Sequence, residues 1–167
     1  MKYQIAYTNR YGNAGVLAKE IMKILPSKST DVMDLSYCEI SSDADVYLIG
    51  FEIVLDTLPL NIINILEKLE GKTVLCFATC GMATTENQER IKRTILPFLP
   101  DECDYRGLFV CPGQIPANVM DTTQKVLDKD PENKLAKTMM EGFQRSMNHP
   151  DMEDLYNLRR FINASGI

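Results

Sequence analysis

The sequence has no tryptophan and a single histidine, His149, among its 167 residues. One imidazole cannot form the histidine cluster that many zinc and iron sites use, and its position beside Pro150 favours a structural role. The sequence also lacks any run near the roughly 18 apolar residues that span a membrane, and its first residues, MKYQIAYTNR, contain no apolar secretory segment. We therefore expect a cytoplasmic protein with no membrane span.

Clusters of lysine and arginine are likewise absent. The chain has 18 Lys and Arg against 23 Asp and Glu, which gives a net charge of -5, and the acidic residues are spread along it. Nucleic-acid binding requires clustered positive charge. The composition therefore argues against that function and suits a protein that docks on a basic partner.

Cysteines are few and odd in number, and most lie in apolar runs, at Cys38, Cys76, Cys80, Cys103 and Cys111. This predicts reduced thiols in a cytoplasmic core rather than disulfides. Cys76 and Cys80 share one predicted strand, where four residues span roughly 13 Å. That distance is too long for a shared metal ion or a bridge, and we predict no metal site.

The rest of the composition is typical of one globular domain over residues 1–167, with 45% hydrophobic and 25% charged residues. Short runs rich in Val, Ile, Tyr and Phe predict five strands, at residues 3–8, 30–35, 44–51, 73–79 and 105–111. The segments between them have apolar residues at helical spacing. This alternation predicts an α/β fold, a doubly wound parallel sheet with helices on both faces.

The C-terminal third has a different pattern. A loop with two prolines and a glycine follows residue 111, and the remainder is polar, rich in methionine and helical in periodicity. We expect at least two helices there. Asp151, followed by Glu153 and Asp154, predicts the N-terminal cap of the last one.

The stretch YTNRYGNAG, residues 7–15, connects the first predicted strand to a helix. A glycine-containing turn of this kind presents backbone N–H groups at the helix N-terminus, where they attract an anion, and phosphate is the natural guest. Thr8 and Asn13 add donors, Arg10 adds charge, and Gly12 lets the backbone turn. An ordinary strand-to-helix turn is the alternative, since glycine and asparagine also favour turns.

This stretch, extended to YTNRYGNAGVLAKEI, resembles the flavodoxin signature Ser/Thr-x-x-Thr-Gly-Asn-Thr. It departs from that signature at two positions, Tyr11 and Ala14, where the family usually has hydroxyl residues. The resemblance implies strand order 2-1-3-4-5 and a loop that holds the phosphate of FMN. The residues of that loop are Thr8, Asn9, Arg10, Tyr11, Gly12, Asn13 and Ala14.

Two further segments resemble the flavin-ring loops of the same family. In ADVYLIGFEIVLDTLPLNIINILEKLEGKTVLCFATCG the implied ring contacts are Phe51, Glu52, Ile53, Val54 and Asp56. Val54 and Asp56 stand where the family has a stacking aromatic and a glycine, so Phe51 or Tyr11 is the candidate stacking residue. A core position is the alternative for Phe51.

The other segment, ATCGMATTENQ, implies that backbone N–H groups meet the pyrimidine edge of the flavin, at Thr79, Cys80, Gly81 and Met82. Thr84 or Thr85 is expected to cap the helix that follows. The carboxylates Glu52 and Asp56 are the expected source of negative charge near the ring.

The tail segments GLFVCPGQI and HPDMEDL resemble a subgroup of short flavodoxin-like proteins, so the resemblance covers essentially the whole chain. Some members are similar to partners that deliver electrons to larger reductases, including reductases of bile pigments in gut bacteria. The resemblance implies an FMN-binding electron carrier without catalytic residues, a monomer or homodimer that works with a reductase or acceptor enzyme. An FMN-dependent NAD(P)H:quinone-type reductase, or a binding module that has lost FMN, remains open.

Overall fold

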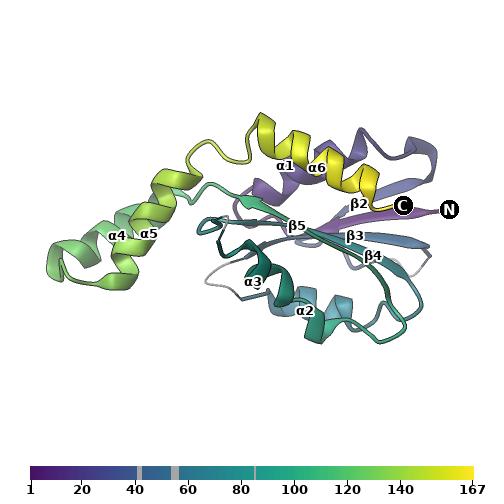
Figure 1. The fold of residues 1–167 in the computed structure, drawn as a ribbon, viewed down its shortest axis with the longest axis horizontal. Coiled ribbons are helices and arrows are strands. Elements are labelled where there is room, and N and C mark those ends of the chain that lie inside the picture. Colours follow the sequence, from purple (N-terminus) through teal and green to yellow (C-terminus); the bar gives the residue numbers. More distant parts are fainter. Residues whose placement is uncertain (41–42, 54–56, 85) are drawn as a thin grey trace.

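Five parallel strands form one sheet in the order β2-β1-β3-β4-β5, which confirms the predicted doubly wound topology (Figure 1). The computed structural model describes residues 1–40, 43–53, 57–84 and 86–167. The strands are β1 (Tyr3–Tyr7), β2 (Thr30–Asp34), β3 (Val46–Ile53), β4 (Thr73–Cys80) and β5 (Asp104–Pro112). All eight residues of β3 are buried, as expected for a central strand covered on both faces.

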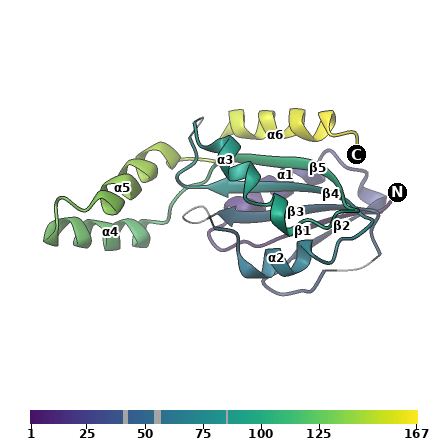
Figure 2. The same cartoon turned by 60° about the horizontal axis from the view of Figure 1, so that its bottom comes forward.

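Two helical layers cover the sheet (Figure 2). On one face lie α1 (Asn13–Met22) and α6 (Met152–Ala164), and on the other lie α2 (Leu60–Leu66) and α3 (Gln88–Arg93). Each layer has its own apolar core, because side chains of β3 alternate between the faces. Short 3-10 turns, η1 (Ser27–Ser29) and η2 (Leu96–Phe98), connect the layers to the sheet.

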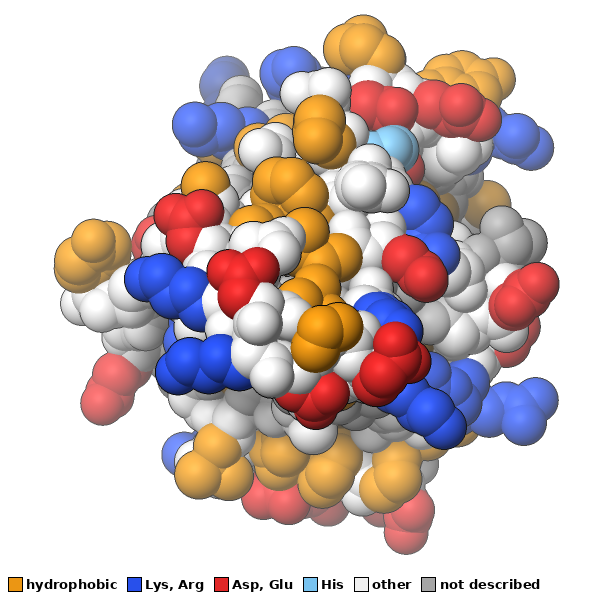
Figure 3. Space-filling view, turned by 90° about the vertical axis from the view of Figure 1, so that its left-hand side faces the viewer, with side chains coloured by type: hydrophobic (Ala, Val, Ile, Leu, Met, Phe, Trp, Pro, Cys, Tyr) orange, Lys and Arg blue, Asp and Glu red, His pale blue; other side chains and the backbone are white. Residues whose placement is uncertain are grey.

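Two more helices, α4 (Ala117–Lys129) and α5 (Lys134–Ser146), form a hairpin that projects beyond the sheet (Figures 1 and 2). The prediction of at least two helices in the C-terminal third is therefore confirmed. Between α4 and α5 runs a groove of about 400 Å³. From this end the molecule shows a strip of apolar side chains flanked by charged ones (Figure 3).

Within the described ranges, no helix is long and apolar enough to cross a membrane.

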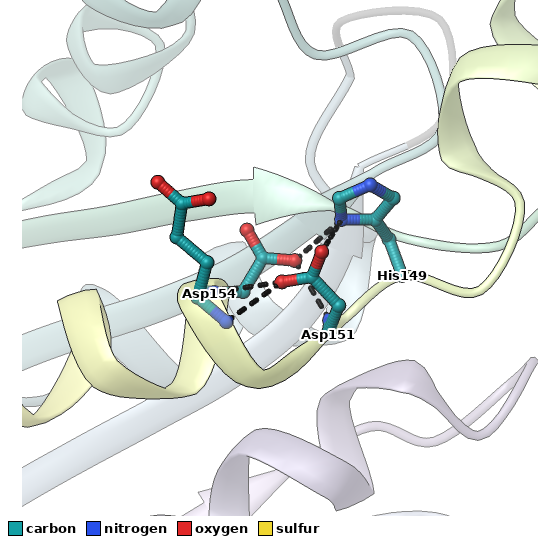
Figure 4. A network of polar contacts seen from close by, with 4 residues as sticks. His149, Asp151 and Asp154 are labelled. Carbon is teal, nitrogen blue, oxygen red and sulfur yellow. Dashed lines mark hydrogen bonds and ion pairs between the residues drawn. The ribbon is translucent and has the colours of Figure 1, made fainter.

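The last helix begins with the predicted cap. The Asp151 carboxylate accepts hydrogen bonds from the backbone N–H groups of Glu153 and Asp154, and the Asp154 carboxylate accepts one from the N–H of Asp151. His149 lies beside this capping box, its Nδ1 2.6 Å from the Asp154 carboxylate (Figure 4). The ligand atoms of these three residues lie close enough together to hold a metal ion. Both carboxylates, however, already accept hydrogen bonds from backbone N–H groups at the start of α6.

Candidate functional site

The predicted loops converge on a cavity at the carboxyl edge of the sheet, where the strand order switches and ligands bind in open α/β folds. This edge cavity has a volume of about 110 Å³. It is lined by Tyr11, Asn13, Glu52, Ile53, Thr79, Cys80, Gly81, Met82, Gly113, Gln114, Ile115, Pro116, Val119 and Met139. The first eight of these residues were predicted from the sequence, and the structure brings them together.

The sequence did not predict the outer wall of the edge cavity. That wall consists of the loop after β5 and the beginning of the hairpin, with Ile115, Pro116 and Val119, and of Met139 from α5. The available signal was the proline-rich loop directly after the fifth strand. Because the carboxyl ends of parallel strands meet at one edge, that loop had to lie near the other two.

Glycines permit the close contact between the α4–α5 hairpin and the loop after β4. A Cβ added to Gly142 of α5 would lie 3.1 Å from the carbonyl oxygen of Gly81. A Cβ added to Gly81 would lie 2.4 Å from Cγ1 of Ile115, closer than real Cβ atoms come. The hairpin therefore packs directly on the loop after β4 and closes one side of the cavity.

The side chain of Glu52 occupies the predicted anion position of the first loop. One of its carboxylate oxygens accepts a hydrogen bond from the N–H of Tyr11 at 2.9 Å, and the other accepts one from the N–H of Asn13 at 3.1 Å. Glu52 is only 6% exposed. The backbone N–H groups that the sequence assigned to a phosphate therefore bind a carboxylate of the same chain.

Other side chains engage the rest of this loop. The Asn9 side chain accepts a hydrogen bond from the N–H of Gly15 at 3.0 Å, and the Asn13 amide donates to the carbonyl of Gln114 at 3.0 Å. Gly12 precedes the helix with a φ of 91°, a left-handed conformation that glycine adopts readily. Asn9 and Asn13 therefore stabilise the turn itself.

Burial raises the pKa of Glu52 above its ordinary value, against the N–H donors of the loop and the charge of Arg10, which lower it. The guanidinium of Arg10 lies over the ring of Tyr11, 5.1 Å from its centroid. A second cavity of about 430 Å³, here named the loop cavity, lies on this side of the first loop. Its lining includes Thr8, Asn9, Arg10 and Glu52, so Glu52 separates the two cavities.

The remaining predicted residues have different positions. Phe51 is completely buried within the core cluster that α2 and α3 cover, so the structure supports the core alternative over a stacking role. Ala14 is also buried and lines neither cavity. Val54 and Asp56 lie outside the described residues.

Thr84 was expected to cap the helix after β4, but the residue that precedes α3 is Asn87, and Thr84 forms a local turn with it. Its hydroxyl accepts a hydrogen bond from the N–H of Asn87 at 3.3 Å, and the Asn87 side chain accepts one from the N–H of Thr84 at 2.8 Å. This turn ends before the helix, which begins at Gln88 and has no side-chain cap at Asn87. Thr85, the alternative cap, lies outside the described residues.

The first loop as folded does not fit the phosphate of FMN. Its donors already bind Glu52, and a phosphate would lie against a buried carboxylate of the same sign. The edge cavity is also smaller than the roughly 300–1,000 Å³ of typical ligand pockets. Phosphate binding at this loop would require the Glu52 side chain to leave.

Comparison with known proteins agrees with the fold. Residues 4–163 match the flavodoxin domain. Two relatives are flavodoxin-like domain-containing proteins BilS, one from Clostridium symbiosum and one from Clostridioides difficile, each 22% identical to this chain. The alignments cover 99% and 96% of this chain and 96% and 94% of the relatives.

A solved structure, the Streptococcus pneumonia TIGR4 flavodoxin, superposes with a TM-score of 0.63 over 100% of both chains, at 14% identity. At that identity the likeness concerns the fold. Since the domain match spans nearly the entire chain, the protein belongs to the flavodoxin domain family.

Proposed function

We propose that this protein binds a flavin at the edge cavity and transfers electrons to or from a partner protein. One observation carries the proposal. The first loop, the end of β3 and the loop after β4 converge on a single cavity at the switch point of the sheet, where open α/β folds bind their ligands. The flavodoxin domain match supports the choice of a flavin as that ligand.

The residues around the edge cavity favour an electron carrier over a stand-alone enzyme. A bound flavin would supply the redox chemistry. Among the described lining residues there is no His, Lys or Arg, and Glu52 is the one acid. General acid–base catalysis needs a positioned group that gives or takes a proton, and Glu52 already binds two backbone N–H groups.

The partner would approach beside the α4–α5 hairpin, since the hairpin forms a wall of the edge cavity. We propose that the partner is a reductase or an acceptor enzyme. The net charge of -5 suits a basic contact surface on that partner, because complementary charge accelerates association.

A specific observation favours a second candidate function, that of a flavodoxin-fold binding module without a flavin. The donors of the first loop are engaged by Glu52, and the edge cavity is small. In that case the fold would serve protein–protein contact alone, since a fold by itself does not determine function.

Flavin titration separates the two functions. Adding FMN or riboflavin to the purified protein should quench flavin fluorescence, and Met139→Lys, which places a charge in the wall of the edge cavity, should weaken binding. The matched control is Met22→Lys, because Met22 is an exposed methionine at the end of α1. Protein that quenches neither flavin would support the second function.

Reduction assays then distinguish a carrier from an enzyme. The loaded protein should accept electrons only through a separate reductase. Rapid reduction by NADH alone, with passage to a quinone, would identify it as a reductase instead.

A further inference from the structure

We propose that Glu52 is a built-in substitute for the flavin phosphate, so that the protein binds flavin without recognising the phosphate group. The part of this inference that concerns flavin depends on the proposed function. The part that concerns the loop does not, because it follows from the hydrogen bonds of this chain. In those hydrogen bonds the Glu52 carboxylate takes the place of a bound anion at the first loop.

Side chains of the same chain engage the backbone donors in the first turn of α1. The first N–H groups of any helix lack partners within the helix. Here Tyr11 and Asn13 donate hydrogen bonds to the Glu52 carboxylate, the N–H of Ala14 helps to lower the pKa of that carboxyl, and Gly15 donates to the Asn9 side chain. From Val16 onward the N–H groups have helical partners, beginning with the carbonyl of Gly12. A phosphate would find these donors occupied.

The stagger of two neighbouring strands explains why Glu52 reaches this position. Tyr7, the last residue of β1, pairs with Gly50 of β3, and β3 continues three residues further, to Ile53. Glu52 therefore lies level with the loop that follows β1. A strand in the middle of the sheet holds it there, paired on its other side with Thr79.

Side-chain alternation along β3 sets the direction of the Glu52 side chain. Ile49, Phe51 and Ile53 belong to the core cluster under α2 and α3, and Leu48 belongs to the cluster under α1 and α6. Since successive side chains point to opposite faces, Glu52 points to the face that α1 covers. Register and alternation together place the carboxylate at the N-terminus of α1.

Charge opposes a second anion in the same place. Two negative groups that share a site disfavour each other's charged forms, and the low dielectric of a buried position strengthens that repulsion. Arg10 is the cation that acts on Glu52 among the described residues. The Glu52 carboxylate already neutralises the single positive charge of Arg10, so no uncompensated positive charge remains for a phosphate.

Phosphate titration tests the loop without any flavin. Inorganic phosphate should cause no saturable shift of the Tyr11, Asn13 and Ala14 amide signals in 15N NMR spectra of the wild type. In Glu52→Ala, which frees these donors, the same signals should shift and saturate. Glu52→Gln, which keeps the side-chain size, is the second variant and should show weaker saturable shifts.

The matched control is Glu20→Gln, which removes one negative charge from a buried acid on the same helix. Glu20 pairs with Lys23 and Arg159, away from the loop. This variant should remain unresponsive to phosphate. Saturable shifts in the wild type, or none in either Glu52 variant, would overturn the inference.

Flavin preference provides the second measurement. The wild type should bind FMN and riboflavin with affinities that differ less than threefold, and Glu52→Ala should prefer FMN by tenfold or more. A wild type that binds FMN at least tenfold more tightly than riboflavin would contradict the inference. If no variant binds either flavin, the proposed function fails, and the phosphate titration still decides the role of Glu52.

Discussion

The helices α1 and α6 lie side by side on one face of the sheet (Figure 1). Each has a carboxylate at its N-terminus. At α6 the carboxylate belongs to Asp151, the residue directly before the helix. At α1 it belongs to Glu52 of β3, which is 39 residues from Asn13 in the sequence. The same electrostatic need of a helix N-terminus is thus met once by local sequence and once by tertiary structure.

The largest effect is expected from removing Glu52, the carboxylate that caps α1 from a distant part of the chain. Glu52→Ala should lower the free energy of unfolding by about 2 kcal/mol, because several buried N–H donors lose their acceptor. Urea unfolding measures this loss. The control Glu89→Ala removes an exposed acid of α3 and should leave stability nearly unchanged. Unaltered stability of Glu52→Ala would show that water replaces the carboxylate at no cost.

A neutral local cap should have a smaller effect. Asn133 precedes α5, and its side chain accepts a hydrogen bond from the N–H of Ala136 at 3.0 Å. Asn133→Ala should cost about 1 kcal/mol and should increase hydrogen exchange in the hairpin before it affects the sheet. Asn118→Ala, an exposed substitution within α4, should have no such effect. Equal exchange in both variants would mean that the cap does not hold the hairpin.

Most of the fold could be predicted from local patterns. Short apolar runs separated by helical spacing predicted all five strands, and Asp151 before Glu153 and Asp154 predicted the N-terminal cap of the last helix, because these signals lie within a few residues of one another. The direction of the α4–α5 hairpin could not be predicted. It depends on Gly142 meeting Gly81, a contact between distant parts of the chain.

The candidate site was predicted in its residues but not in its chemistry. The sequence placed Glu52 near the flavin ring, as a source of negative charge. Its actual contact depends on β3 extending past β1 and on which face each side chain of β3 takes. Every residue of β3 is buried, so the sequence does not alternate between polar and apolar residues in a way that would tell which side chains point to which face of the sheet. The same ambiguity made Phe51 a candidate stacking residue.

The smallest expected effect, and the sharpest contrast between the two carboxylates, is in the pH dependence of stability. Burial raises the pKa of Glu52 above its ordinary value of 4.5, so the folded state keeps this proton to higher pH than the unfolded state. Its contribution to the free energy of unfolding therefore falls as pH rises from 4.5 through the folded pKa. In Glu52→Gln this decline should disappear.

Asp151 should behave in the opposite way. The N–H of Asp154, with His149 and the N–H of Glu153, lowers its pKa below the ordinary 3.8, so the folded state releases this proton first. Its contribution is present above 3.8 and is lost as pH falls through the folded pKa. Asp151→Asn, which retains a capping side chain, should therefore lose stability relative to the wild type only above that range. Urea unfolding from about pH 3 to pH 7 measures both slopes, and slopes of one sign in the two variants would mean that the carboxylates cap their helices in the same way.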